Sequence, residues 1–471
     1  MRVSLHNRTI HAVKLTLMML LSSILILSGC EDSASSALNT VPAVAEAVTP
    51  AAEPGEPVSF WVATDMHYLD KALEDGGQAF QTYVTGGDGK MLPYSDELTE
   101  ALVRDVEQNK PAFLILSGDL TNNGEAGSHK ELAAKLHRME AAGTRVYVTP
   151  GNHDINNPWA RSFDGDKQVV AKHINVEDFL RIYDDFGYNE AVSRDADSLS
   201  YAVKAAPGLW LLMLDSAQYA HNEEYNFPQT DGRLLPSTLA WIDDNVKRAA
   251  QEHASVITVM HHNLLSHTSM AVSGFKLNNS QETMKAFRRN GLNLVLSGHI
   301  HMQDIRRDPP EASIDPALPV YDIATSAMAV NPHQYGRMTF DPASRAVTYH
   351  TAQVDVDGWA KANHKTDPHL LNFKAYAEQI FAENSYDKAM KRLKESSFTE
   401  AQKQSMAEVM SKLNVKYFAG NAADSLEEIR AMPGFKLWES MEGGFMSGYI
   451  RSMAEHAEVS NTSLEMVLTT Q

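Results

Sequence analysis

Strand-length apolar runs that stop at polar or glycine-containing segments recur through the first part of the chain. The clearest three occupy residues 58–64, 113–117 and 145–149. Each is short and mainly apolar, which favours a buried strand over a helix. All three are followed by segments rich in Gly, Asn, Asp or His.

Two stretches between these runs have the apolar spacing of amphipathic helices. Ser95 is predicted to cap the first helix, and Ser128 with Glu131 is predicted to form a capping box for the second. Their apolar faces consist of Leu98, Leu102 and Val106, and of Leu132, Leu136 and Met139. Alternation of strands and helices predicts an α/β fold in which parallel strands are covered by helices.

A second group of strands follows a polar excursion over residues 155–198, in which we expect a helix near 176–186. Further strands are predicted at 199–203, 209–214, 255–260, 292–296, 320–324 and 346–354. The last two are expected to close a second sheet. Further helices are predicted to begin at Ser237 and near Gln281.

After about residue 357 the chain becomes polar and then helical. Two capping patterns indicate helices there: Thr399 with Gln402, and Ser425 with Glu428, whose helix is predicted to end at Pro433-Gly434. We therefore expect a body over residues 58–356 and a helical domain over 357–471. This domain is interpreted as a satellite packed on the body, and a partner-binding or site-shaping surface is the alternative.

The amino terminus has the pattern of a targeting segment. Basic residues precede an apolar stretch over 15–27, which is too short for a confident membrane span. Leu27-Ser-Gly-Cys30 resembles a bacterial lipobox, and Cys30 is the only cysteine in the chain. The sequence therefore predicts a signal peptide over 1–30, lipid on Cys30 and a flexible linker over 31–57. A lipid-anchored, extracytoplasmic protein is expected, in the periplasm or at the cell surface, with inner or outer membrane open.

Composition limits the function classes. The 471 residues can form one large domain and a smaller one, and 43% hydrophobic content is typical of a globular chain. Acidic residues outnumber basic ones by 60 to 41, for a net charge of −19. Proteins that bind duplex nucleic acid usually carry a basic stripe, so this class is disfavoured. Oligomeric state is left open.

Metal-binding residue types gather where the apolar runs end. They are Asp65, His67, Asp119, Asn152, His153, Asp154, His261, His262, His299 and His301. Ligands in α/β folds collect beyond the carboxyl ends of strands, so these side chains are expected to converge. Carboxylate, amide and imidazole donors suit two divalent transition metals, and one carboxylate can bridge them.

These motifs, in this order, resemble the calcineurin-like metallophosphoesterases, and most closely the branch with class III cyclic-nucleotide phosphodiesterases. The resemblance covers residues 58–354 and implies a four-layer αββα sandwich with the helical domain appended. It rests on Asp65-x-His67, Gly118-Asp119-x4-Gly124, Gly151-Asn152-His153-Asp154, His261-His262 and Gly298-His299-x-His301.

The resemblance also implies roles for single residues. Asp65, His67 and His301 would bind one metal, Asn152, His261 and His299 the other, and Asp119 both. His153 would face the phosphate, contact substrate together with Asn152, and protonate the leaving oxygen, while Asp154 would orient its ring. The family often has His-His-Pro or Gly-His where this chain has His261-His262-Asn263, so His262 is the alternative to His261. His333 and Tyr335 are further candidates for lining the substrate pocket.

The function implied is phosphodiester hydrolysis, with 3′,5′-cyclic AMP-like nucleotides as the leading small substrate. Attack would come from a hydroxide between two Fe, Mn or Zn ions. One alternative is a phosphomonoesterase or nucleotide hydrolase of the same fold. The other is a substrate-binding lipoprotein without turnover. The long polar insertion between Asp65 and Ser95 is expected either to roof the site or to form a surface loop.

Overall fold

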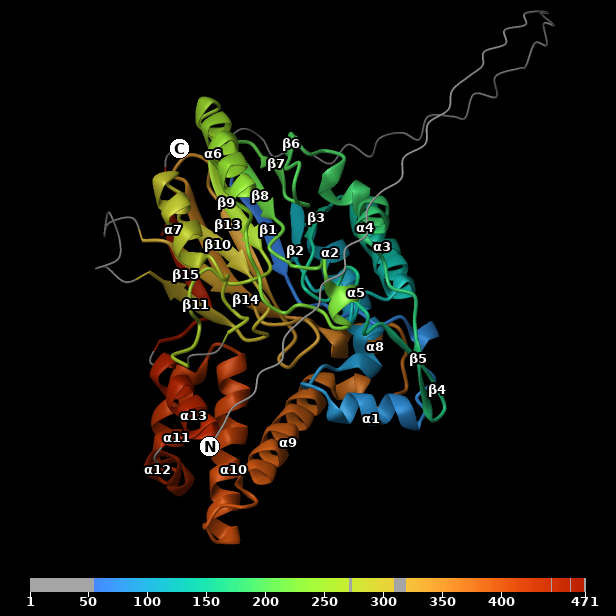
Figure 1. The fold of residues 1–471 in the computed structure, drawn as a ribbon, viewed down its shortest axis with the longest axis vertical. Helices are drawn as coiled ribbons and strands as arrows, with labels where there is room; N and C mark the ends of the chain where they lie inside the picture. The colour runs from blue at the N-terminus through green and yellow to red at the C-terminus, as the bar shows by residue number, and fades with distance from the viewer. Residues whose placement is uncertain (1–54, 271–272, 309–318, 442, 458, 470–471) are drawn as a thin grey trace, which may run out of the picture. The chain divides into compact units, whose positions relative to one another are not determined.

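Two facing β-sheets with helices on their outer sides form the body of the protein (Figure 1). The computed structural model describes residues 55–270, 273–308, 319–441, 443–457 and 459–469. The predicted signal peptide, Cys30 and most of the predicted linker lie outside these residues. Apolar side chains from both sheets share one core, which includes Val62 and Ile115 of the first and Ile257 and Leu296 of the second.

The first sheet has the strand order β15-β14-β13-β1-β2-β3. Its strands are β1 (Val58–Ala63), β2 (Phe113–Ser117), β3 (Arg145–Thr149), β13 (Gln334–Phe340), β14 (Ala346–Gln353) and β15 (Ser463–Val467). The strands β1, β2 and β3 are parallel, as predicted, whereas β13, β14 and β15 add antiparallel partners. The prediction that the strand at 346–354 closes the second sheet is wrong, because β14 pairs with β13 in the first.

The second sheet has the order β11-β12-β10-β9-β8-β7-β6. Its strands are β6 (Ser193–Arg194), β7 (Tyr201–Ala206), β8 (Leu209–Leu214), β9 (Ser255–Met260), β10 (Leu294–Ser297), β11 (Asp304–Arg307) and β12 (Tyr321–Ala324). Along β9, Ile257 and Val259 face the shared core, while Val256 and Met260 face the outer helices. This alternation explains why the strand is apolar throughout.

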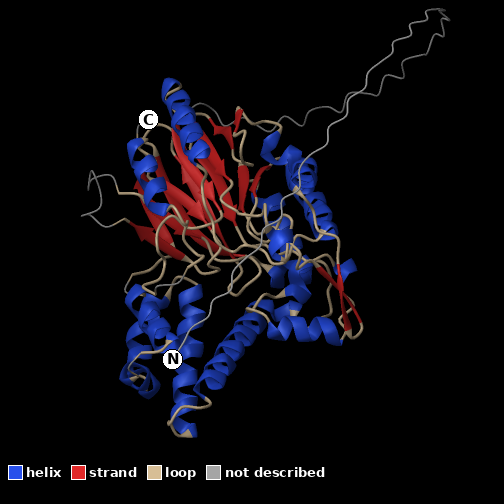
Figure 2. Cartoon of the chain, in the orientation of Figure 1, coloured by secondary structure: helices blue, strands red, loops and turns tan. Residues whose placement is uncertain are grey.

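Helices cover the outer face of each sheet, which gives the four-layer αββα sandwich expected (Figure 2). Over the first sheet lie α2 (Ser95–Asn109), α3 (Ala126–Ala141) and α4 (Val176–Tyr183), which runs into a π turn (Asp184–Tyr188). Over the second sheet lie α6 (Pro236–Gln251) and α7 (Ser280–Arg289).

Three predicted helix caps are wrong. Ser95, Ser128 and Ser237 lie inside α2, α3 and α6, whose N-cap positions make no side-chain capping bond. Two of these serines form hydrogen bonds to the backbone of a distant segment instead. The Ser95 hydroxyl accepts from the backbone N–H of Leu69 and donates to its carbonyl, and the Ser128 hydroxyl accepts from the N–H of Asp70.

The insertion after Asp65 contains more regular structure than the sequence predicted. It forms a 3-10 turn (Lys71–Leu73), helix α1 (Gln78–Gly86) and a second 3-10 turn (Leu92–Tyr94). Phe80 and Tyr83 of α1 pack on Phe163 of the hairpin β4 (Arg161–Asp164) and β5 (Lys167–Val170). Helix α5 (Asn222–Tyr225) lies in the segment between β8 and α6.

The carboxyl-terminal region is mainly helical. It contains α8 (Val356–Ala362), α9 (Phe373–Leu393), α10 (Glu400–Phe418), α11 (Leu426–Ala431), α12 (Pro433–Ser440) and α13 (Phe445–His456), with 3-10 turns at Leu370–Asn372 and Ala422–Ser425. The capping box of Thr399 and Gln402 is confirmed. Ser425 precedes α11 but makes no side-chain capping bond, and Pro433 begins α12 rather than ending α11. The tail is not entirely helical, because β15 returns to the first sheet.

The carboxyl-terminal helices share a core with the end of the second sheet. Ile300, Met302 and Ala324 belong to the same buried cluster as Met410 and Leu413 of α10. Figure 1 shows α9, α10 and α13 beyond the ends of the strands, next to the loops. The helices therefore pack directly on the segment that carries His299 and His301.

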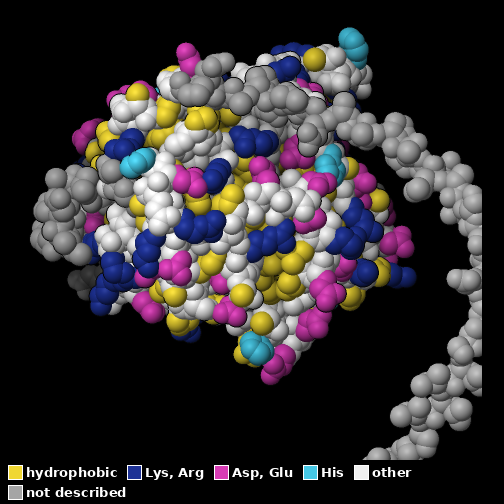
Figure 3. Space-filling model, turned by 90° about the horizontal axis from the view of Figure 1, so that it is seen from above, with side chains coloured by type: hydrophobic (Ala, Val, Ile, Leu, Met, Phe, Trp, Pro, Cys, Tyr) yellow, Lys and Arg dark blue, Asp and Glu magenta, His cyan; other side chains and the backbone are white. Residues whose placement is uncertain are grey.

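The described surface mixes charge types. Figure 3 shows Lys and Arg side chains interspersed with acidic and apolar ones on the face seen from above. Among the described helices, none is long and apolar enough to cross a membrane.

Candidate dinuclear metal site

The predicted ligands lie on five loops that leave the carboxyl ends of neighbouring strands. Asp65 and His67 follow β1, Asp119 follows β2, Asn152 follows β3, His261 follows β9, and His299 and His301 follow β10. Because β1, β2 and β3 are parallel, and β9 and β10 are parallel, these ends meet at one edge of the sandwich.

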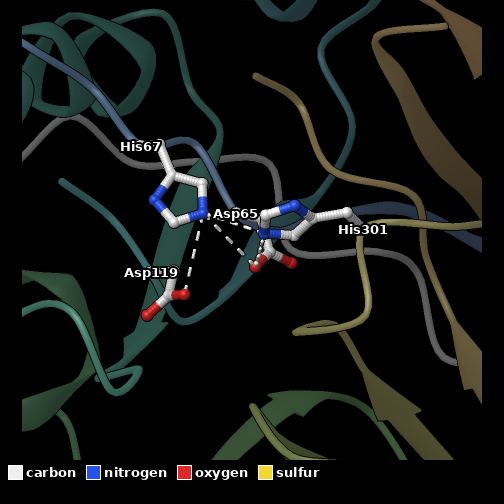
Figure 4. Close-up of side chains that lie close together, drawn as sticks. All are labelled: Asp65, His67, Asp119 and His301. Atoms are coloured by element: carbon white, nitrogen blue, oxygen red, sulfur yellow. Dashed lines mark hydrogen bonds and ion pairs between the residues drawn. The ribbon is translucent and has the colours of Figure 1, made fainter. Parts of the chain in front are cut away.

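Asp65, His67, Asp119 and His301 form the first donor group (Figure 4). His67 Nε2 lies 3.0 Å from His301 Nε2 and 3.7 Å from Asp119 Oδ2. Asp65 Oδ1 lies 3.4 Å from His301 Nε2. All four side chains point their donor atoms into the same small space.

The second donor group consists of Asp119, His261 and His299. His261 Nε2 lies 3.2 Å from Asp119 Oδ2, 3.2 Å from His299 Nδ1 and 3.1 Å from Asn152 Oδ1. The amide oxygen of Asn152 therefore completes this group. Asp119 belongs to both groups through the same oxygen, Oδ2, which is the geometry of a bridging carboxylate.

The donor chemistry fits two divalent metals. Nitrogen and oxygen ligands lie about 2.0–2.2 Å from such an ion, so neighbouring ligand atoms are about 3 Å apart. The separations in both groups are near this value. Asp65 Oδ1 is buried without a hydrogen-bond partner among the described residues, as is His67 Nδ1. Burial of an unpaired carboxylate oxygen is costly unless a cation binds it.

Hydrogen bonds to backbone carbonyls outside the two groups hold two of the rings. His261 Nδ1 donates to the Ser117 carbonyl at 3.0 Å, and His299 Nε2 donates to the Gly274 carbonyl at 2.9 Å. These bonds fix the tautomer that leaves the other ring nitrogen free for a metal. His301 Nδ1 lies 3.9 Å from a carboxylate oxygen of Asp88.

Five of these residues have backbone angles that side chains other than glycine rarely adopt. The φ values are 50° for Asp65, 40° for His67, 49° for Asp119, 71° for His299 and 61° for His301. Strained backbone of this kind persists where surrounding structure enforces it, and it clusters at functional sites.

Electrostatics favour ligand-competent protonation states. Burial lowers the pKa of His67 well below its usual value and that of His299 to about 4, so both rings are neutral at pH 7. Burial acts to raise the pKa of Asp119, but the charges of His261 and His153 outweigh it and hold this pKa well below the usual value. His67 and His299 thus present neutral imidazoles beside an anionic carboxylate. Burial acts to lower the pKa of His261, but the charge of Asp119 outweighs it and raises this pKa to about 9, so the His261 ring must release a proton when a metal binds.

His153 lies beside the two groups, with Nε2 4.0 Å from Asp119 Oδ2. The expectation that Asp154 orients its ring is wrong. The Asp154 carboxylate accepts backbone N–H bonds from Gly151, Leu120 and Thr121, and so holds the two loops together. Asn123, which the sequence analysis did not single out, holds the ring instead, with Oδ1 2.9 Å from His153 Nδ1. Its place in the polar loop after Asp119 was the available signal.

His262 points away from both donor groups. Its Nδ1 lies 2.9 Å from the Ser216 hydroxyl and its Nε2 lies 3.2 Å from the Thr230 carbonyl. Of the two adjacent histidines, His261 is the one with a ring nitrogen in the cluster.

The structure does not bring His333 and Tyr335 into the site. His333 is buried, with Nδ1 donating to the Met328 carbonyl and its ring against Phe373. Tyr335 packs on Trp61 and accepts from Arg337. The described cavities near the metal groups are lined by other residues.

Residues of the insertion after Asp65 line a cavity next to the metal groups. Lys90 Nζ lies 3.4 Å from Asp88 Oδ2, and the Tyr83 hydroxyl accepts from the amide nitrogens of Asn122 and Asn123. Tyr83, Asp88, Lys90, Asn123 and His153 line part of a cavity of about 430 Å³. Of the two expectations for the insertion, a roof over the site fits these contacts.

Comparison with protein families gives two matches. Residues 58–303 match the family described as calcineurin-like phosphoesterase, and residues 355–459 match the C-terminal domain of cyclic nucleotide phosphodiesterase. The first match spans more than half of the chain and contains every predicted metal ligand. No curated protein matches the chain.

Comparison with solved structures gives matches at low identity. A dimetal phosphatase from Danio rerio is 12% identical, with a TM-score of 0.44 over 64% of this chain and 97% of that one. A purple acid phosphatase from yellow lupin (Lupinus luteus) is 14% identical, with a TM-score of 0.41 over 64% of this chain and 52% of that one.

Proposed function

Because the chain belongs to the calcineurin-like phosphoesterase family, we propose that it hydrolyses phosphodiesters, with nucleotides of the 3′,5′-cyclic AMP type as the leading class. The observation that carries the diester preference is the match of residues 355–459 to the C-terminal domain of cyclic nucleotide phosphodiesterase. The two donor groups that share Asp119 support hydrolysis itself.

The ligand residues supply the framework of this reaction. Two Fe, Mn or Zn ions, when bound, provide Lewis acidity and lower the pKa of water. Asp119 Oδ2 and the surrounding imidazoles would hold the two ions close together. The Asp154 carboxylate holds together the two loops that carry Asp119 and Asn152, so these two ligands need little reorganisation.

His153 is suited to act on the substrate rather than on a metal. Its backbone N–H donates to Asp119 Oδ1 at 2.9 Å, while Asn123 holds its ring. Its side chain is 19% exposed and lines the cavity that Lys90 also lines. Burial lowers the pKa of His153 to about 4, so its ring is neutral at pH 7 and would take up the proton that it delivers once an anionic phosphoryl group is bound beside it. In that protonated form it would stabilise charge on the phosphoryl oxygens and supply a proton to the leaving oxygen.

The test is turnover by the purified full chain with Fe, Mn or Zn added separately. We expect faster hydrolysis of bis(p-nitrophenyl) phosphate than of p-nitrophenyl phosphate, hydrolysis of 3′,5′-cyclic AMP, and loss of all three activities in Asp119→Asn. Preference for the monoester would favour the phosphomonoesterase alternative. Binding of cyclic AMP without turnover, at full metal occupancy, would favour the substrate-binding lipoprotein.

The location proposed for this activity is extracytoplasmic, on a lipid anchor at Cys30. The support is the lipobox-like Leu27-Ser-Gly-Cys30 and the absence of any other cysteine in the sequence. Cys30→Ala should move the protein from the membrane fraction to the soluble fraction of cells. Unchanged membrane association of that variant would contradict the anchor.

A further inference from the structure

Two cavities lie between the metal-bearing loops and part of the carboxyl-terminal helices, beside the contacts that join them. One cavity of about 690 Å³ is bounded by Asp88 and Gly89 on the body and by α9, α10 and α13 on the other side. An adjoining cavity of about 400 Å³ shares three aromatic residues with it: Phe418, Phe445 and Tyr449. We refer to the two together as the helical cleft.

The helical cleft begins at the first donor group. Asp88, at one end of the larger cavity, has Oδ2 3.9 Å from His301 Nδ1. Ile300 and Met302, on either side of His301, line the smaller cavity. A substrate whose phosphate is bound by the donor groups could therefore extend into this cleft.

Aromatic side chains form one part of its lining. Phe445 is 61% exposed, an unusual state for a large apolar ring, and lines both cavities. It is stacked with Tyr449 at 6.3 Å between centroids and an interplanar angle of 15°. Exposed aromatic faces of this kind bind nucleobases by stacking, with little dependence on which base is present.

Cationic side chains form the far part of the lining. Lys388, Lys391 and Arg392 line the larger cavity from α9, and all three are exposed. No ion pair or hydrogen bond joins their side chains to another described residue. Asp88, at the metal end, is the one acidic residue among those described in that lining. The far end thus has unpaired positive charge in a chain that is acidic overall.

The spacing along α9 separates these cations from the metal end. Phe381, near the start of the cleft, packs with Ala327 and Val330 of the body. Lys388 and Arg392 follow it by seven and eleven residues, which is about 10 to 16 Å along the helix. A 3′,5′-cyclic mononucleotide has one phosphate, which the donor groups would bind. The cations are therefore placed for a second anion.

We propose that the helical cleft binds the part of the substrate beyond the scissile phosphate, and that the preferred substrates are nucleotide phosphodiesters with a second phosphate. The base would stack on Phe445, and the second phosphate would bind Lys388, Lys391 and Arg392. This inference rests on the proposed phosphodiesterase function, and within that function it favours diesters with a second phosphate over cyclic mononucleotides. Such a diester can be linear, with a terminal phosphate, or a cyclic dinucleotide.

The test uses a triple variant of the full chain, Lys388→Gln, Lys391→Gln and Arg392→Gln. Its control, Lys374→Gln, Lys394→Gln and Lys436→Gln, removes the same charge from carboxyl-terminal helix positions outside the described cavities. Substrates are the 5′-phosphorylated dinucleotide pApA, its analogue ApA without the terminal phosphate, cyclic di-AMP, cyclic AMP and bis(p-nitrophenyl) phosphate.

We expect the cleft variant to lose about ten-fold or more in kcat/KM for diesters with two phosphates, mainly through KM. Losses for ApA, cyclic AMP and bis(p-nitrophenyl) phosphate should stay within about two-fold, as should all losses in the control. Comparing the loss in kcat/KM for pApA with that for cyclic di-AMP shows whether the preferred diester is linear or cyclic. Equal losses for every substrate, or no loss for pApA and cyclic di-AMP, would overturn the proposal.

Affinity measurements distinguish failure of this proposal from failure of the proposed function. In a His153→Ala background, pApA should bind about ten-fold more tightly than ApA, and the cleft substitutions should remove this difference. If turnover of every diester is absent but the difference is present, the phosphodiesterase function fails and the cleft site stands. If turnover is present and the two ligands bind equally, the cleft proposal fails alone.

Discussion

At the scale of single residues, His153 is placed to act in the reaction without binding a metal. It contacts Asp119 and Asn123, but its ring lies outside both donor groups. His153→Ala should therefore lower kcat for diesters by about 10²–10⁴-fold, typical for a general acid, with metal content unchanged. Metal analysis and turnover of the same preparation check this. A matching loss of bound metal would make His153 a ligand instead.

His267 shows how a buried charge ties loops together. Its ring lies between Asp304 at 2.8 Å and Asp322 at 3.3 Å, and Arg306 also pairs with Asp304. Its backbone carbonyl accepts from Tyr417 of α10 and His456 of α13. Asp322 in turn accepts from Ser297, two residues before His299. A network on no predicted motif thus joins the metal-bearing loop to the carboxyl-terminal helices.

This network should make stability depend on pH. Burial acts to lower the pKa of His267, but Asp322 and Asp304 outweigh it and raise this pKa to about 9 from 6.5. The folded state then holds the proton more tightly, so the stabilisation is complete below pH 6.5 and is lost as pH rises through 9. The shift corresponds to about 3 kcal/mol.

Urea unfolding of the wild type and His267→Gln at pH 6 and pH 9.5 measures this contribution. The wild type should be more stable than the variant at pH 6, and the difference should shrink at pH 9.5. A difference that is independent of pH would indicate a neutral ring.

Some of the site residues could be predicted from the sequence, and others could not. Asp65, Asp119 and His299 were found because polar residues interrupt apolar runs at strand ends, a local signal. Asn123 was missed because its role depends on the ring of His153, which a different loop supplies. The network around His267 was missed because His267 pairs with residues 37 and 55 positions away in the sequence.

At the scale of elements, local pattern located strands well and helix starts poorly. Ser95 and Ser128 have the composition of caps, yet their hydroxyls bind the backbone of Leu69 and Asp70. Strand β14 was found but assigned to the wrong sheet, because its partner β13 was not among the predicted strands. Pairing partners of this kind are set by tertiary packing rather than by propensity.

Two predicted caps in the tail offer a direct comparison. Thr399 makes a reciprocal capping box with Gln402, whereas Ser425 makes no side-chain cap bond. Thr399→Ala should reduce the free energy of unfolding by about 1 kcal/mol, and Ser425→Ala by less than about 0.5 kcal/mol. Denaturant midpoints of the two variants measure this. Equal losses would show that the capping bonds of Thr399 add no measurable stability.

At the scale of the whole molecule, the carboxyl-terminal region and the body form one folding unit. Ile300, Met302 and Ala324 of the body are buried with α10, and β15 completes the first sheet. A chain that ends at residue 354 would expose these apolar groups and the edge of β14. We expect it to be insoluble or to unfold at much lower denaturant than the full chain.

A chain that begins at residue 55 and ends at residue 471 provides the control. It should match the full chain in denaturant midpoint and in turnover of bis(p-nitrophenyl) phosphate. If the chain ending at residue 354 were equally stable, the carboxyl-terminal helices would be an independent domain that contributes nothing to the body.

The position of β15 has a consequence for how the protein is made. This strand pairs with β14 across more than a hundred intervening residues, and it lies at the very end of the described chain. A ribosome synthesises β15 more than a hundred residues after β14, so β14 remains an open edge during that interval. The first sheet cannot be completed until β15 has been synthesised, and until then the β14 edge of the nascent chain is open to pairing with another strand.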